Sequence, residues 1–144
     1  MDVARNIKVL FITGFGPIVR DPPESRKFYR DVLGIPFDVV KEESADYLHT
    51  EALPGAKTFA LWPLSQAAYS CFGSFSWPER IPVPQAWLEF DVENVEAATA
   101  ELQARGYLVL VKNKKEPWGQ TVTRLVSPEG LLLAVTFTPS MRKE

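Results

Sequence analysis

The sequence has very few of the residues that build disulfides and metal sites. Among its 144 residues there are one cysteine, Cys71, and one histidine, His49. A single cysteine excludes a disulfide within the chain, and a reducing cytoplasm is the simplest location for it. One histidine cannot build a metal site alone, so we expect His49 to be a partly exposed strand residue and not a ligand.

Long apolar runs and an excess of one charge are also missing. No apolar run approaches the roughly 18 residues that a membrane span needs, and the first residues lack the apolar segment of a signal peptide. Sixteen Lys and Arg against 18 Asp and Glu give a formal net charge of −2. This balance offers no electrostatic case for nucleic acid. We therefore expect neither a membrane nor a nucleic acid as partner.

What the sequence does contain is enough apolar residues for a packed interior. Hydrophobic residues make up 46% of the chain, and this length is typical of one domain, or of two small modules that share a core. We expect a single domain over 1–144. Within it, module one covers about 7–63, a linker with a short helix at 64–71 covers about 64–84, and module two covers about 85–137.

The two halves of the chain repeat one pattern, in which a strand is followed by a capped helix, a glycine and further strands. The expected strands cover 7–19, 37–41, 47–52, 58–62, 87–92, 107–111, 120–126 and 131–136, and the expected main helices cover 23–33 and 95–105. Glu24 and Glu96 each stand ten residues before the glycine that ends their helix (34−24 and 106−96). A repeat of 72 residues (96−24) predicts two βαβββ modules fused as a pseudo-dimer.

Two stretches carry recognisable motifs. The first helix has Val19, Asp21, Ser25, Phe28, Tyr29, Leu33 and Gly34 in a characteristic spacing. A Pro-Trp-Gly loop at 117–119 precedes the last hairpin, whose turn runs from Ser127 to Gly130. Both motifs resemble the vicinal oxygen chelate superfamily, in particular its glyoxalase/bleomycin-resistance/dioxygenase family, although Ser127 stands where that family has Asp. The resemblance covers roughly 7–137.

This resemblance implies the fold. Two βαβββ modules would form an α+β domain in which eight strands curl into a cupped, incomplete barrel, and the cup would hold a small-molecule ligand. Relatives are commonly homodimers, so the resemblance also implies a homodimer.

The positions that bind metal in many relatives carry other residues here. By the resemblance, these positions correspond to Gly14, Trp87, Ala134 and about Ala60. None of these side chains can coordinate a cation, because ligation needs carboxylate, imidazole or thiolate groups. We therefore expect a member of the family that lacks the metal site and needs no cofactor.

Strand alternation predicts which side chains face the cup. Alternate residues of a strand share a face, so Trp87, Glu89 and Asp91 face the cup if Leu88, Phe90 and Val92 pack on the helix. By the same argument, Val122 and Arg124 face the cup. Gly14, Gly16 and Ala134 should leave room there, and the Lys112–Lys115 run should be solvated.

These considerations give five candidate ligand-binding residues: Trp62, Trp87, Glu89, Trp118 and Arg124. Alternatives stay open for each of them. Trp62 and Trp87 also suit core positions, and Trp118 also suits contact with a partner or burial in the core. Glu89 and Arg124 also suit a structural role in which they pair with each other, since buried charges need partners.

The leading hypothesis is a metal-independent small-molecule binding protein, similar to the bleomycin-resistance type that sequesters antibiotics. Trp118 would stack on a planar, partly cationic ligand, and Glu89 would attract its charge. The alternative is a metal-free enzyme of the same fold with Glu89 as acid or base, although only Arg124 is evident as a second titratable group. A third interpretation is a regulatory module that binds a partner protein.

Overall fold

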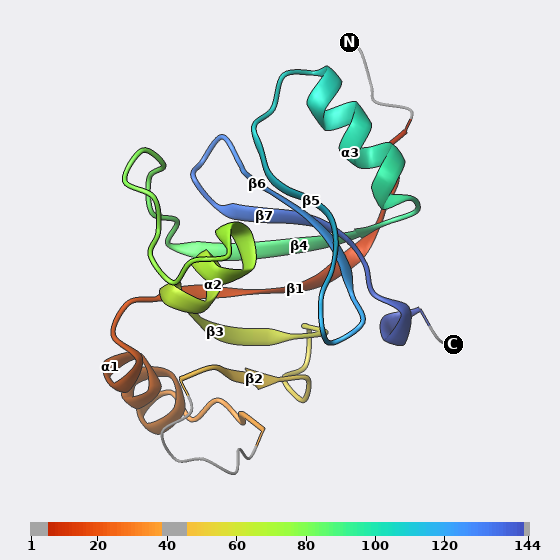
Figure 1. Cartoon of the computed structure of the whole chain (residues 1–144). Coiled ribbons are helices and arrows are strands. Elements are labelled where there is room, and N and C mark those ends of the chain that lie inside the picture. The colour runs from red at the N-terminus through yellow and green to blue at the C-terminus, as the bar shows by residue number, and fades with distance from the viewer. Residues whose placement is uncertain (1–5, 39–45, 143–144) are drawn as a thin grey trace.

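The computed structural model describes residues 6–38 and 46–142 and shows one curved, open sheet with helices packed against it (Figure 1). Seven strands lie in the order β2-β3-β1-β4-β7-β6-β5. They are β1 (Val9–Val19), β2 (Leu48–Thr50), β3 (Phe59–Pro63), β4 (Ala86–Val92), β5 (Val109–Lys115), β6 (Thr121–Val126) and β7 (Leu132–Phe137). The helices are α1 (Pro22–Arg26) with its π-helical continuation η1 (Lys27–Val32), α2 (Leu64–Phe72), α3 (Val95–Ala104) and the 3-10 turn η2 (Pro139–Met141).

The strand pairing has the two-fold pattern that the repeat predicts. In the first half, β1 pairs in parallel with β3, and in the second half β4 pairs in parallel with β7. The two halves join where β1 and β4 run antiparallel. The α+β cupped fold is therefore confirmed, with an open sheet. Where the first module should have a further strand over 37–41, residues 39–41 lie outside the described ranges and Phe37 and Asp38 are not in a strand.

Equivalent polar residues start the main helix of each half. The Asp21 side chain accepts a hydrogen bond from the Glu24 backbone N–H at 3.2 Å, and Asn94 accepts one from Ala97 at 2.9 Å. Each bond satisfies a backbone donor that has no partner within its helix. The local sequence therefore places α1 and α3 at corresponding points after β1 and β4.

The two faces of the sheet have separate cores. On the outer face, Val92 and Val135 pack with Val95 and Ala98 of α3. On the cup face, Trp87 and Leu132 pack with Ile18, Ala60, Trp62 and two residues of α2, Ala67 and Cys71. This alternation along β4 and β7 is the one that the sequence predicts. The expected linker thus contributes α2 to the core of the cup, while the exact module boundaries stay a prediction.

The room expected beside the glycines of β1 is largely taken by Trp87. The Trp87 indole N–H donates to the carbonyl oxygen of Ala60 at 3.1 Å. A Cβ atom added at Gly16 would lie 1.9 Å from that carbonyl oxygen and 3.0 Å from the indole nitrogen. One added at Gly14 would lie 2.9 Å from the Trp87 ring. The expectation that these glycines enlarge the cavity therefore needs correction, because they mainly admit the indole and the neighbouring strand.

Within the described ranges, no helix has both the length and the apolar character that a membrane crossing requires.

Candidate functional site

A cavity of about 650 Å³ lies in the cup, and all five candidate residues line it. They come from β3, β4, β6 and the loop before β6, so only the folded chain brings them together. Further lining residues that the sequence analysis did not select include Tyr47, His49, Glu51, Gln120, Thr138 and Met141. That the five candidates bind a ligand stays a prediction, but their location around one cavity is what such a role requires.

Glu89 and Arg124 form a buried ion pair on the cup face. Arg124 Nη1 donates to Glu89 Oε2 at 2.8 Å, and the two side chains are 1% and 10% exposed. In the sheet register both residues pair with Ala134 of β7, which lies between their strands. Because the Ala134 side chain is small, the two long side chains can meet above it. The space expected at Ala134 is therefore used by this pair.

The surroundings of Arg124 keep its guanidinium charged. Burial alone would lower the pKa of Arg124, but the charge of Glu89 and the hydrogen bond to it outweigh burial, and the net shift of the pKa is upward. The guanidinium carbon also lies 4.7 Å from the centre of the Trp62 ring, a cation–π geometry. Trp62 is therefore both a core residue and a support for the charge in the cup.

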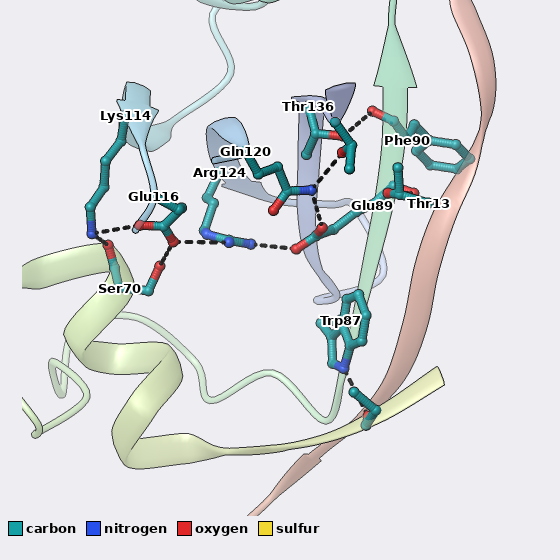
Figure 2. A network of polar contacts seen from close by, with 12 residues as sticks. Thr13, Ser70, Trp87, Glu89, Phe90, Lys114, Glu116, Gln120, Arg124 and Thr136 are labelled. Atoms are coloured by element: carbon teal, nitrogen blue, oxygen red, sulfur yellow. Dashed lines mark hydrogen bonds and ion pairs between the residues drawn. The ribbon is translucent and has the colours of Figure 1, made fainter. Parts of the chain in front are cut away.

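A second carboxylate approaches Arg124 from the loop after β5. Glu116 Oε2 lies 3.4 Å from Arg124 Nη2 and accepts a hydrogen bond from Ser70 Oγ of α2 at 2.8 Å. Lys114 Nζ contacts Glu116 Oε1 at 3.2 Å and donates to the Ser70 carbonyl oxygen at 2.9 Å. Figure 2 shows Arg124 between the two carboxylates. The expectation that the whole Lys112–Lys115 run is solvated is thus wrong for Lys114, because Glu116 draws it inward.

Gln120 joins this network through Glu89 (Figure 2), and it also lines the cavity. Its amide nitrogen donates to Glu89 Oε1 at 3.0 Å and to Thr138 Oγ1 at 2.9 Å. Its amide oxygen accepts from the Trp118 indole N–H at 2.9 Å. Both carboxylate oxygens of Glu89 are therefore engaged, one by Arg124 and one by Gln120. Trp118 is 63% exposed, so the hydrogen bond to Gln120 is what fixes its ring at the cavity.

Titratable residues also reach the cavity from β2 and its ends. Tyr47, His49 and Glu51 are alternate residues, and all three line the cavity. The Tyr47 and His49 rings stack with their centres 5.7 Å apart. Partial burial, with the charges of Glu89 and Glu51, raises the pKa of Tyr47 to about 12, so its hydroxyl stays protonated. His49 Nε2 lies 3.0 Å from Asp38 Oδ2, and the His49 side chain is 35% exposed, as expected for a partly exposed strand residue.

Asp91, the third residue of β4 expected on the cup face, has a structural role. Its carboxylate accepts hydrogen bonds from Thr136 Oγ1 at 2.6 Å, from the Thr138 backbone N–H at 3.1 Å and from Arg142 Nε at 2.8 Å. These bonds hold the chain after β7 against the sheet, where η2 lines the cavity. Asp91 is therefore a fixed point for one wall of the site.

Sequence signals existed for some of the missed residues and not for others. Gln120 shares its strand face with Arg124, since the two are four residues apart, and alternation alone would have selected it. The same argument applies to Tyr47, His49 and Glu51. No comparable signal points to Glu116 or Ser70. Glu116 reaches Arg124, and Ser70 reaches Glu116, only through the packing of a loop and of α2.

The residues at the expected metal positions do not fit a metal ion. Gly14, Ala60, Trp87 and Ala134 offer no ligating side chain. Trp87 instead donates its N–H to the protein backbone. Among residues 6–38 and 46–142, no group of three or more His, Cys, Asp or Glu could hold a metal ion.

Two related βα modules are joined edge to edge, and a cavity lies in the resulting cup. These features define a class of small α+β domains. The family model described as Glyoxalase/Bleomycin resistance protein/Dioxygenase superfamily matches residues 14–135. The chain belongs to this superfamily. A search of curated proteins finds no match to the sequence.

Solved structures share the fold at low sequence identity. Methylmalonyl-CoA epimerase from Mycobacterium tuberculosis is 18% identical, with a TM-score of 0.55 over 92% of this chain and 91% of that one. A superfamily member from Vibrio splendidus 12B01 is 18% identical, with a TM-score of 0.53 over 90% and 97%. The Streptomyces coelicolor epimerase with bound 2-nitronate-propionyl-CoA is 16% identical, with a TM-score of 0.53 over 95% and 100%. At these identities the likeness shows the fold alone.

Proposed function

We propose that this protein binds a planar, partly cationic small molecule in the cup without the help of a metal ion. The observation that carries the proposal is the composition of the cavity wall. Trp62, Trp87 and Trp118 provide flat apolar surface, and a small set of polar groups lies among them. Cavities of about this size that combine mostly apolar walls with a few placed polar groups are typical of small-molecule sites.

The charges of the wall favour a positive ligand. The lining carries two carboxylates, Glu51 and Glu89, and one guanidinium, Arg124, which gives a formal charge of −1 (1−2) with His49 neutral. Arg124 already contacts the carboxylates of Glu89 and Glu116, so little of its charge is available to an anion. A planar cation would gain from Glu51, whose exposed carboxylate lies outside the Glu89–Arg124 pair, and from stacking on the indoles.

The contacts of Glu89 do not suit a role as acid or base. An acid or base must be within hydrogen-bond reach of the proton that it transfers. Both Glu89 oxygens already accept hydrogen bonds from Arg124 and Gln120, at 2.8 and 3.0 Å. The alternative hypothesis, an enzyme that uses Glu89 as acid or base, would have to break one of these bonds. The binding function therefore has the stronger support.

A direct test uses the tryptophans as reporters, since three of the four in the chain line the cavity. We expect a planar aromatic cation, such as an acridinium dye, to quench tryptophan fluorescence with one-to-one saturation. A neutral dye of the same shape should bind more weakly, and added salt should reduce this difference. Quenching that does not saturate, or equal affinity for the two dyes, would contradict the proposal.

Metal independence has its own test. Binding should be unchanged after dialysis against a chelator, because the family's metal positions hold Gly14, Trp87 and Ala134. Elemental analysis of the untagged protein that found nearly stoichiometric zinc, nickel or iron would contradict it.

We also propose that the protein is a cytoplasmic homodimer. Large apolar side chains on β1 and η1 are exposed in the single chain, including Ile12, Phe15, Phe28 and Val32. The only cysteine, Cys71, is a buried thiol, which suits a reducing compartment. Light scattering on the purified protein tests whether it is a dimer, and a monomer at micromolar concentration would contradict this part of the proposal.

A further inference from the structure

A pair of titratable groups that the proposed binding function does not use lies at the cavity wall formed by β2. His49 lines the cavity, and its Nε2 is 3.0 Å from Asp38 Oδ2. The backbone N–H of Asp38 also donates to the His49 carbonyl oxygen at 2.8 Å. Two separate contacts therefore hold the carboxylate against one nitrogen of the imidazole.

The same contacts leave the other imidazole nitrogen available. Within the described residues, His49 Nδ1 has no hydrogen-bond partner. The Tyr47 ring stacks on the imidazole at an interplanar angle of 28° and restricts its rotation. An imidazole that a carboxylate orients through one nitrogen, in a residue that lines a binding cavity, has the arrangement of a general base.

This pair differs from Glu89 in exposure and, among the described residues, in having a nitrogen that accepts no hydrogen bond, and a proton acceptor needs both. Glu89 is almost fully buried, and both its oxygens are occupied by fixed donors. His49 is 35% exposed at the cavity wall and has a free ring nitrogen in the described part of the chain. In the described part of the chain, a ligand atom that bonds to Nδ1 would replace no protein hydrogen bond.

We propose that His49, oriented by Asp38, removes and returns a proton of a planar cation bound in the cup. The proton belongs to a carbon substituent at the ring position next to the cationic nitrogen. This inference rests on the proposed binding function and adds a reaction to it. The substrate class is an aromatic cation with an acidic C–H bond, such as an N-alkylated heteroaromatic ring that carries a methyl group.

The step balances without a further reactant. Nδ1 takes the proton, and the electron pair of the broken C–H bond neutralises the ring and leaves a neutral enamine-like compound. The positive charge moves to an imidazolium whose Nε2–H is hydrogen-bonded to the Asp38 carboxylate. The same imidazolium then returns a proton to this carbon or to a conjugated one, so the net result is isotope exchange or a shift of a double bond.

The reaction is tested with N-methylquinaldinium in heavy water, with deuterium uptake into its ring methyl group followed by NMR. General acid–base catalysis contributes roughly 100-fold or more, so the wild-type protein should accelerate exchange to about that extent over buffer. His49→Ala should reduce exchange to the buffer rate, and Asp38→Asn should reduce it to a rate between those of wild type and buffer. Asp31→Asn removes a carboxylate of an exposed pair with Arg30 and should leave the rate unchanged.

A second measurement uses only the wild-type protein, so it does not depend on whether a variant folds. Because His49 is the only histidine of the chain, the imidazole nitrogens give one pair of NMR signals. We expect the Nε2–H tautomer in the wild type, and we expect the Nδ1 signal to shift as the probe cation is added. A signal that the cation leaves unchanged would overturn the proposal.

The outcomes separate this inference from the binding function. If the cation quenches tryptophan fluorescence but wild type and His49→Ala exchange deuterium at the same rate, the inference is wrong and the binding function stands. If the cation does not bind at all, the proposed function fails, and the inference fails with it. The binding function and the inference are both supported if the cation binds, His49→Ala loses the exchange activity and Asp31→Asn keeps the wild-type rate.

Discussion

Arg124 of β6 and Glu89 of β4 meet across the intervening strand β7, with Arg124 Nη1 2.8 Å from Glu89 Oε2. Both residues are in register with Ala134, whose side chain is fully buried beneath the pair. The contact therefore depends on three adjacent strands at once. Since the pair also borders the cavity, the stability of the sheet and the charge of the site rest on the same side chains.

Breaking this pair should destabilise the fold strongly. Arg124→Met leaves the buried carboxylate of Glu89 without its cation and Glu116 with Lys114 alone, and loss of one partner of a buried pair typically costs about 3–5 kcal/mol. Urea denaturation would measure the fall in the free energy of unfolding. The double variant Glu89→Gln with Arg124→Met should recover part of the loss, because Glu116 keeps Lys114. Equal stability of wild type and Arg124→Met would show that the pair is not held as described.

A larger side chain at Ala134 should separate the ion pair. Ala134→Val adds two methyl groups in a fully buried position between Glu89 and Arg124, and overpacking of this kind costs about 1–3 kcal/mol. Thermal unfolding would show the loss. Ala100→Val, at an exposed position of α3, is the matched control and should change the unfolding temperature little. If the two variants behave alike, the space above Ala134 is not critical.

Trp118 should matter for binding and little for stability. The residue is 63% exposed, so Trp118→Ala should leave the unfolding transition nearly unchanged. Loss of one stacked aromatic contact should cost about 1 kcal/mol, a several-fold weakening of a planar ligand. Calorimetry would measure the affinity. Tyr69→Ala, at another exposed aromatic residue that does not line the cavity, is the control.

The position of Trp118 should depend on Gln120. Gln120→Leu removes the acceptor of the indole N–H and should weaken the ligand to a similar extent as Trp118→Ala. If Trp118→Ala lowers stability and leaves affinity unchanged, Trp118 is a core residue and the stacking hypothesis is wrong.

Glu51 provides a test of charge attraction that leaves the buried network intact. It is exposed at the cavity and has no part in the Glu89–Arg124 pair. Glu51→Gln should weaken a planar cation several-fold at low ionic strength, and the difference from wild type should shrink in high salt, because exposed charges are screened. Titrations of one dye at two salt concentrations measure this. A difference that does not depend on salt would indicate a contact other than charge.

Cys71 should make stability depend on pH in the alkaline range. Burial raises the pKa of this thiol from its usual value near 9 to about 11. Between these values the unfolded chain loses the thiol proton and the folded chain retains it, so stability is complete below pH 9 and falls as pH rises to 11. The loss is on the order of 2–3 kcal/mol. Cys71→Ala should remove this component, and Tyr47, which titrates higher, remains in both proteins. If the stability of wild type and of Cys71→Ala depended on pH in the same way, the burial of the thiol would be contradicted.

Much of the fold follows from patterns that act over short distances in the sequence. Asp21 and Asn94 cap their helices through their own side chains, so the start of each helix can be predicted locally. Alternation along β4 places Glu89 and Val92 on opposite faces, because successive side chains of a strand point to opposite sides. The repeat then indicates that the two halves pair as modules. These relationships need no knowledge of the packed structure.

The residues that make up the polar network around Arg124 could not be predicted from local patterns. Glu116 and Ser70 are 46 residues apart (116−70) and meet because α2 packs into the cup, which no local pattern specifies. The place of the Trp87 indole beside Gly16 also could not be predicted locally, because β1 and β4 belong to different modules and must first lie side by side.

Which residues face the cup follows from the sequence alone, because side-chain direction in a strand is a local property. How those residues are used depends on the packed domain. The tertiary structure joined Arg124 to two carboxylates, fixed Trp118 through Gln120 and held His49 against Asp38. Each of these contacts depends on distances between separate strands and loops, and those distances are set by the packing of the whole domain.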